Sequence, residues 1–78
     1  MMYCIVRNIE NVDHSFTKMY YAGIDQKMHL PGWTIAEHYD IVYKYASRAE
    51  ARKALAELLA KYTNYIMGAY IVEYHLNE

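Results

Sequence analysis

The 78-residue chain contains a single cysteine and therefore cannot form an internal disulfide bond. Small domains of oxidising compartments usually depend on several such bonds. The N-terminal stretch MMYCIVRN also lacks the basic segment, the apolar segment and the small-residue cleavage site of a secretory signal. We therefore expect a cytoplasmic protein. Because a chain of this length has a small core, packing or a second subunit must supply its stability.

The sequence also lacks long apolar runs and an excess of basic residues. No run of about eighteen apolar residues occurs, so we expect no membrane span. Eight Lys and Arg face nine Asp and Glu, whereas proteins that bind phosphate backbones normally carry a clear basic excess. Nucleic acid is therefore a disfavoured partner. The three glycines form no glycine-rich phosphate loop.

The residues that are present favour β-strands. The segments MYCIVRNI and FTKMYYAGI, the second starting at Phe16, are rich in β-formers and flank the polar stretch ENVDHS. They predict a hairpin, because consecutive strands are usually neighbours in a sheet. The segment Ile41–Ser47 predicts a third strand. Residues 65–76 predict a fourth, in which Gly68 marks a bulge or a close backbone approach.

A helix is predicted directly after the third strand. Ser47 and Glu50 have the spacing of a capping box, in which each side chain accepts a backbone hydrogen bond at the start of a helix. Glu57 and Lys61 have the favourable i,i+4 spacing on its charged side. The apolar residues recur at the period of one helix face, and they are Ala51, Ala54, Leu55, Leu58, Leu59 and Tyr62.

These elements predict a single α+β domain over residues 1–78. Its elements follow the order β-β-β-α-β along the chain, and its four strands lie in the order 4-1-2-3 in the sheet. One amphipathic helix packs on one face. A right-handed crossover through that helix would return the fourth strand parallel to the first. A single helix covers only one side of such a sheet, so we expect the other side to be open.

Ten tyrosines are the most unusual feature of the composition. A tyrosine ring offers a large apolar face and one polar end, and it needs a partner for both. Alternation along the last two strands groups four of them on one face, which we assign to the open side of the sheet. Trp33, from the adjoining loop, plugs the edge of the small core. The predicted partner-binding residues are Tyr43, Tyr45, Tyr70, Tyr74 and Trp33.

Three uses of such a face stay open at this point. The face would close a homodimer, from which a small core gains stability. It would grip a larger protein or protein complex, because tyrosine is enriched among the residues that anchor interfaces. It would stack the bases of a single-stranded nucleic acid, although the expected basic residues are sparse.

The segment from Asp25 to Asp40 has no clear period. Within it, Leu30-Pro31-Gly32-Trp33 predicts a tight turn, in which proline sets one backbone angle and glycine adapts to the next. Thr34 and Glu37 have the capping-box spacing and predict one short helical turn before the third strand.

Residues of catalytic or metal-binding type are scattered. Cys4 lies among apolar neighbours, which favours a buried, inert thiol. His14 and Ser15 point to opposite sides of an extended chain. The set His29, His38 and Asp40 contains metal-ligand side chains but no established spacing, so whether it binds a metal stays open. We predict no catalytic residue, no cofactor and no enzyme activity.

The stretch IVYKYASRAEARKAL, followed by YIVEY, resembles many small proteins of bacteriophages and other mobile elements. The likeness covers about the second half of the chain, in residues that build the fold. Such proteins include inhibitors of host defence, anti-CRISPR proteins among them, which act by occupying a surface of a larger complex. The tyrosine surplus and the missing catalytic chemistry predict a non-enzymatic protein-binding module, and the resemblance implies a phage-type inhibitor or accessory factor. The alternative is a small domain that binds single-stranded nucleic acid.

Overall fold

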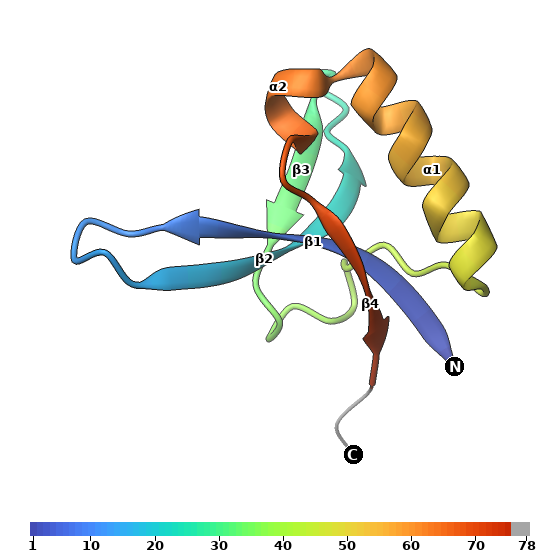
Figure 1. The fold of residues 1–78 in the computed structure, drawn as a ribbon, viewed down its shortest axis with the longest axis horizontal. Coiled ribbons are helices and arrows are strands. Elements are labelled where there is room, and N and C mark those ends of the chain that lie inside the picture. Colours follow the sequence, from blue (N-terminus) through green and yellow to red (C-terminus); the bar gives the residue numbers. More distant parts are fainter. Residues whose placement is uncertain (76–78) are drawn as a thin grey trace.

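The computed structural model describes residues 1–75, and its four strands form one antiparallel sheet in the order β3-β2-β1-β4 (Figure 1). The predicted α+β class, the four-stranded sheet and the strand order are confirmed. No helix in this part of the chain is long and apolar enough to cross a membrane. The elements are β1 (Met2–Glu10), β2 (Phe16–Ile24), β3 (Pro31–Thr34), α1 (Arg48–Lys61), α2 (Thr63–Ile66) and β4 (Tyr70–Tyr74).

The third strand comes from a different segment than predicted. Three residues of the tight turn that we predicted at Leu30-Pro31-Gly32-Trp33 belong instead to β3, Pro31–Thr34, which pairs with the end of β2. Proline and glycine together are a strong turn signal, and this signal was misleading here. Proline is tolerated as the first residue of an edge strand, where its missing N–H removes no bond of the sheet. Pro31 has that position, because β3 is the outermost strand beside β2.

The segment Ile41–Ser47, predicted as the third strand, forms only one isolated bridge, between Tyr45 and Tyr3. Its backbone is nevertheless bonded on both sides. The Tyr43 N–H donates to the Tyr21 carbonyl at 2.8 Å. Tyr45 donates to the Tyr3 carbonyl at 2.7 Å and accepts from the Tyr3 N–H at 2.9 Å. The segment is therefore hydrogen-bonded to both β2 and β1.

Residues 42–45 lie between β1 and β2 where these two strands are not paired with each other, and we call them the wedge. The register of β1 with β2 starts at Val6 and Tyr20 and runs from there toward the hairpin turn. Side chains of the wedge point to the two faces of the sheet as predicted from their alternation. Val42 packs on one face of the sheet, and Tyr45 packs on the other.

β4 runs antiparallel to β1, and the parallel pairing that we predicted was wrong. The bridge between Tyr45 and Tyr3 is also antiparallel, so the wedge and β4 run in the same direction. The crossover through α1 thus returns the chain parallel to the segment before the helix, as expected. The prediction failed because the wedge lies beside β1 and opposite to it in direction.

β4 is also shorter than the predicted strand of residues 65–76. Residues 63–66 form α2, and Gly68 lies in the turn that follows, with a φ of +88°. Glycine adopts this left-handed conformation without steric cost, which explains its presence there. The predicted end of the strand at Leu76 lies outside the described residues.

α1 starts as predicted. The Ser47 hydroxyl accepts from the Glu50 N–H at 3.1 Å, and the Glu50 carboxylate accepts from the Ala46 N–H at 3.2 Å, one residue earlier than in a standard capping box. On the predicted apolar face, Ala51 and Leu58 are buried. The short helical turn expected after Thr34 is absent: Thr34 ends β3, and residues 35–41 form irregular turns.

Both faces of the sheet are covered near the wedge. On the helix face, α1 and α2 pack over a cluster whose buried members are Ile5, Tyr21, Leu58 and Ile66. The opposite face, which we call the loop face, holds Cys4, Val6 and Val42, with Tyr20, Val72 and Tyr74 packed against them. The loop face is therefore not fully open, because the chain between β3 and α1 places Val42 on it.

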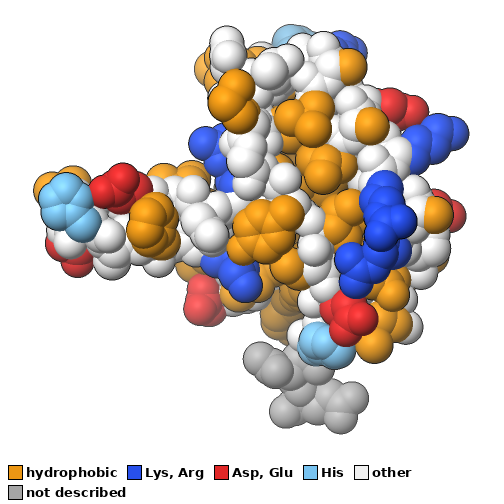
Figure 2. Space-filling model, viewed as in Figure 1, with side chains coloured by type: hydrophobic (Ala, Val, Ile, Leu, Met, Phe, Trp, Pro, Cys, Tyr) orange, Lys and Arg blue, Asp and Glu red, His pale blue; other side chains and the backbone are white. Residues whose placement is uncertain are grey.

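The β1–β2 hairpin extends beyond the rest of the sheet, and we call its projecting part, residues 7–19, the arm. The pairing of β4 with β1 stops at Val6, and the pairing of β3 with β2 starts at Tyr20, so the arm has no strand beside it. It stands out from the body in Figures 1 and 2. Ile9, Val12 and Phe16 are exposed along it.

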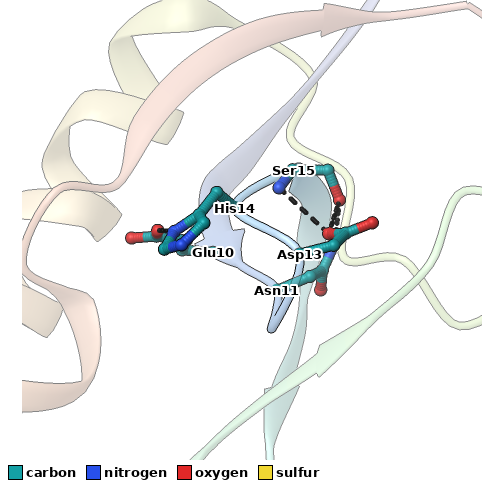
Figure 3. Close-up of polar contacts among 5 residues, drawn as sticks. All are labelled: Glu10, Asn11, Asp13, His14 and Ser15. Atoms are coloured by element: carbon teal, nitrogen blue, oxygen red, sulfur yellow. Dashed lines mark hydrogen bonds and ion pairs between the residues drawn. The ribbon is translucent and has the colours of Figure 1, made fainter.

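Short polar contacts shape the turn at the tip of the arm (Figure 3). Asp13 Oδ1 accepts from the Ser15 N–H at 3.0 Å and from the Ser15 hydroxyl at 2.6 Å, and these bonds lower the pKa of the Asp13 carboxyl. His14, with a left-handed φ of 68°, lies 2.8 Å from the Glu10 carboxylate. The His14 and Ser15 side chains thus have different partners, and they do not contact each other as a nucleophile and base would.

Candidate functional site

The structure divides the predicted partner-binding residues between the two faces of the sheet. Tyr43, Tyr45 and Trp33 lie on the helix face, where Tyr45 and Trp33 pack against the core and the Tyr43 ring packs against that of Tyr45. Tyr74 packs on the loop face, and Tyr70 lies on that face as well, because it pairs with Val6. The five residues therefore do not form one surface. Alternation shows which residues of one segment share a face of the sheet. It does not show whether two segments place their tyrosines on the same face when they are not paired with each other, as is the case for the wedge and β4.

On the helix face, four tyrosines line a cleft of about 400 Å³. The cleft lies between the end of β2, the wedge and the last turns of α1. The rings come from all three of these elements: Tyr21 from β2, Tyr43 and Tyr45 from the wedge, and Tyr62 from the end of α1. We call this feature the tyrosine cleft.

The rings of the tyrosine cleft pack from a buried floor to an exposed rim. Tyr21 is 4% exposed, whereas Tyr43 is 49% exposed. The ring centroids of Tyr21 and Tyr43 are 5.8 Å apart, and those of Tyr43 and Tyr45 are 4.9 Å apart, with both pairs tilted. Trp33 meets Tyr21 edge-on at 6.0 Å and supports the floor from behind. Aromatic pairs at such distances contribute roughly 0.5–1.5 kcal/mol beyond their buried area.

Backbone contacts hold these rings in place. The hydrogen bonds of the wedge to Tyr21 and Tyr3 hold Tyr43 and Tyr45, and the Tyr62 N–H donates to the Leu58 carbonyl at 2.7 Å at the end of α1. The β2 strand has an irregularity between Tyr21 and Ile24, where Gly23 adopts a φ of +93°. Only glycine takes this conformation readily, so Gly23 shapes the wall of the cleft.

Burial raises the pKa of the Tyr45 phenol, and the neighbouring Tyr21, Tyr43 and Glu57 raise it further. Burial likewise raises the pKa of Tyr21, with added contributions from Tyr43 and Tyr62. A phenolate in this place would lose hydration and meet other electronegative oxygens. The Tyr21 and Tyr45 phenols therefore keep their protons at neutral pH, and Glu57 lines the same cleft.

The polar groups of the cleft have few partners of their own. Among residues 1–75, the one tyrosine hydroxyl with a hydrogen bond is that of Tyr70, which donates to Asn8 Oδ1 at 3.5 Å. The expected Glu57–Lys61 ion pair does not form; the Lys61 ammonium instead lies 5.5 Å from the centroid of the Tyr62 ring. The phenol groups and the Glu57 carboxylate are thus free to contact a ligand.

The loop face has a second hollow, of about 490 Å³, whose lining includes Tyr20, Glu37 and Tyr74. Here the aromatic surface already has a cation. Lys44 places its ammonium 5.2 Å from the Tyr74 ring centroid and donates to the Val42 carbonyl at 3.0 Å. We therefore assign the candidate site to the tyrosine cleft.

Other chemistry that we considered does not come together. Cys4 is buried, as predicted, and burial raises the pKa of its thiol to about 11, which makes it a poor nucleophile. Within the described part of the chain, no three His, Cys, Asp or Glu side chains lie where they could hold a metal ion. His38, one of the residues considered, lies with its Nδ1 3.0 Å from the Thr34 hydroxyl.

Two members of the site were missed at the sequence level. Tyr62 was recognised only as the last apolar residue of the helix, and Tyr21 only as a residue of the second strand. Their adjacency to Tyr43 and Tyr45 depends on the wedge. Local patterns hold no signal for that position, because the bonds that fix it join residues more than twenty positions apart.

Comparisons of the chain with protein-family models, with curated proteins and with solved structures found no match. The likeness of the second half of the chain to small phage proteins therefore stays a prediction. Any functional conclusion depends on the chemistry of the tyrosine cleft itself.

Proposed function

We propose that this protein is a non-enzymatic protein-binding module that docks on a larger protein or protein complex through the tyrosine cleft. The observation that carries this proposal is the convergence of four tyrosines, from three separate elements, on one open cleft with unpaired hydroxyls. Tyrosine is enriched among the residues that dominate binding energy, because its ring buries a large area and its hydroxyl adds a directed hydrogen bond.

The rigidity of the cleft supports this role. Tyr43 and Tyr45 are held by backbone hydrogen bonds and by each other's rings, so a partner would order few additional rotamers on binding. A preorganised surface loses less conformational entropy and binds more tightly for the same area. A role as a phage-type inhibitor or accessory factor fits such a surface, since those proteins act by occupying a partner and need no catalytic group.

The proposal is tested by capturing partners from bacterial lysate with the tagged protein and identifying them by mass spectrometry. Tyr43→Ser removes the exposed ring of the cleft, and we expect at least about a tenfold loss of affinity for the captured protein, which is typical of an interface anchor. Tyr70→Ser is the matched control: it removes a similarly exposed tyrosine from the loop face, and capture should persist.

The same experiment separates the alternatives. Equal capture by wild type and Tyr43→Ser would contradict the proposal, and loss only in Tyr70→Ser would move the interface to the loop face. A partner that disappears after nuclease treatment would favour the single-stranded nucleic-acid alternative. If light scattering shows only self-association and that association requires Tyr43, the occupant of the cleft is a second copy of the chain.

A further inference from the structure

Four aromatic rings of the described residues have a cation of the chain beside them, whereas the central rings of the tyrosine cleft have none. Elsewhere the chain supplies its own: Arg7 lies 5.3 Å from the Trp33 ring centroid, Lys44 5.2 Å from that of Tyr74, and Arg48 5.0 Å from that of Tyr3. A cation within about 6 Å of a ring centroid is attracted by the negative face of the ring. This contact is therefore a repeated feature of the protein.

The central rings of the cleft, Tyr21, Tyr43 and Tyr45, take part in none of the cation contacts that the described residues form. They pack against one another at tilted angles, and the Tyr43 ring is half exposed to solvent. The nearest internal cation is Lys61, which lies over the fourth ring, Tyr62, at the rim. The three central rings of the cleft thus offer aromatic surface that contacts no cation of the described residues.

A carboxylate completes the arrangement. Glu57 lines the cleft, acts on the Tyr45 phenol, and has no ion pair among residues 1–75. The Tyr45 phenol oxygen on which it acts can accept hydrogen bonds from ammonium and guanidinium groups. Ring faces, phenol oxygens and an unpaired carboxylate therefore all favour an organic cation with an apolar stem.

We infer that the partner places the charged end of an arginine or lysine side chain in this cleft, stacked on Tyr43 and Tyr45 and paired with Glu57. The inference rests on the proposed function, since it names what the docked protein contributes. The slight negative net charge of the chain, −1, agrees in sign with a basic segment on the partner. The internal cation at the rim, Lys61, opposes such a guest by repulsion.

The test uses three blocked tripeptides, Gly-Arg-Gly, Gly-Lys-Gly and the neutral analogue Gly-citrulline-Gly, titrated at millimolar concentration into the full chain. The signals of the tyrosine rings are followed by nuclear magnetic resonance. We expect saturable shifts of the Tyr43 and Tyr45 rings with the arginine peptide, the lysine peptide or both, and none with the citrulline peptide. The stronger of the two cationic peptides identifies guanidinium or ammonium as the preferred group.

Two substitutions with opposite expected signs sharpen the test. Glu57→Gln should weaken binding of the cationic peptide by about threefold, and Lys61→Met should strengthen it by a similar factor, as expected for exposed charges. Glu37→Gln and Lys53→Met are the matched controls, because these exposed residues lie outside the cleft, and they should change nothing.

Three outcomes would overturn the inference. The first is an equal response to citrulline and arginine, which would show that charge plays no part. The second is the absence of ring shifts with every peptide. The third is a cation response that persists unchanged in both Glu57→Gln and Tyr43→Ser. The proposed function is tested separately by capture through Tyr43, so a cleft that binds a protein but ignores cations would leave that function standing.

Discussion

The two ends of the β1–β2 hairpin differ in sequence and have opposite environments. At one end, Cys4, Ile5 and Val6 are fully buried, with α1 on one face and Val42 on the other. At the other end, in the arm, Ile9 and Phe16 are 37% and 66% exposed. Although the arm is mostly polar, it too carries β-forming apolar residues, among them Ile9 and Phe16. The comparison teaches that burial here depends on which distant segments reach a strand, and not on the strand's own alternation.

The two ends also differ in what holds them together. The arm is held by its own ladder, by polar contacts among residues 10–15 at its tip (Figure 3), and by the hydrogen bond from Asn11 to the Thr17 hydroxyl. The buried end is held by contacts among β1, the wedge, α1 and α2, which are far apart in sequence. We therefore expect the buried end to respond cooperatively to substitutions and the arm to respond locally.

The largest expected difference is between Ile5→Ala and Ile9→Ala. Both residues lie on the same face of β1, four positions apart, but only Ile5 is buried. Ile5→Ala should lower the free energy of unfolding by about 2–5 kcal/mol, the usual cost of truncating a core residue. Ile9→Ala should change it by no more than about 0.5 kcal/mol, as is usual at a surface.

Urea denaturation followed by circular dichroism measures both changes. If Ile5→Ala does not fold, Ile5→Val gives a smaller step of about 0.5–1.5 kcal/mol. Equal losses at positions 5 and 9 would mean that the arm is packed against something in solution, and the contrast between the two ends would fail.

A smaller effect is expected from Ser47→Ala at the start of α1. It removes the hydroxyl that accepts from the Glu50 N–H, and it should cost about 1 kcal/mol. Ser47→Asp, which restores a capping oxygen, should recover most of that loss. Hydrogen exchange should show faster amide exchange in α1, with no change in the arm. A uniform increase across the chain would instead indicate that the two ends unfold together.

The smallest effect, absent at neutral pH, concerns the titration of Tyr45. Burial raises the pKa of the folded-state phenol above its value of 10.0 in the unfolded chain, so the unfolded state loses its proton first as the pH rises. The contribution of Tyr45 to stability is therefore complete below pH 10 and is lost above it. The Cys4 thiol acts in the same direction between its ordinary value of 9.0 and about 11.

Tyr45→Phe keeps the ring and removes the titrating group. We expect its free energy of unfolding to fall less steeply than that of the wild type above pH 10, with the remaining slope below pH 10 due to Cys4. Denaturation curves from pH 8 to 11 measure this difference. Identical slopes for the two proteins would show that the Tyr45 phenol is solvated, and that the cleft at the buried end is more open than its packing indicates.

Much of the fold could be predicted because its signals are local. Ser47 and Glu50 mark the start of α1, and the β-forming segments on either side of ENVDHS mark the hairpin. The third strand was misplaced because the proline and glycine of residues 31–34 act as a turn signal in most contexts and as an edge strand in this one. The sheet order was still predicted correctly, since it follows from neighbouring strands pairing and from the helical crossover.

The candidate site was predicted only in part. Tyr43 and Tyr45 belong to the cleft, and Trp33 supports its floor, whereas Tyr70 and Tyr74 lie on the loop face. The alternation of the last two segments was correct within each segment. Whether two segments share a face depends on how they are joined, and that information is not local.

By itself, the sequence determined the hairpin, the capped amphipathic helix and the presence of many tyrosines in need of partners, because propensity, capping and periodicity act over a few residues. Only the tertiary structure decided that residues 42–45 enter the gap between β1 and β2 and bring four tyrosine rings together. The reason is physical: backbone groups of strands that separate must be paired with another segment, and which segment reaches them depends on packing of the whole chain.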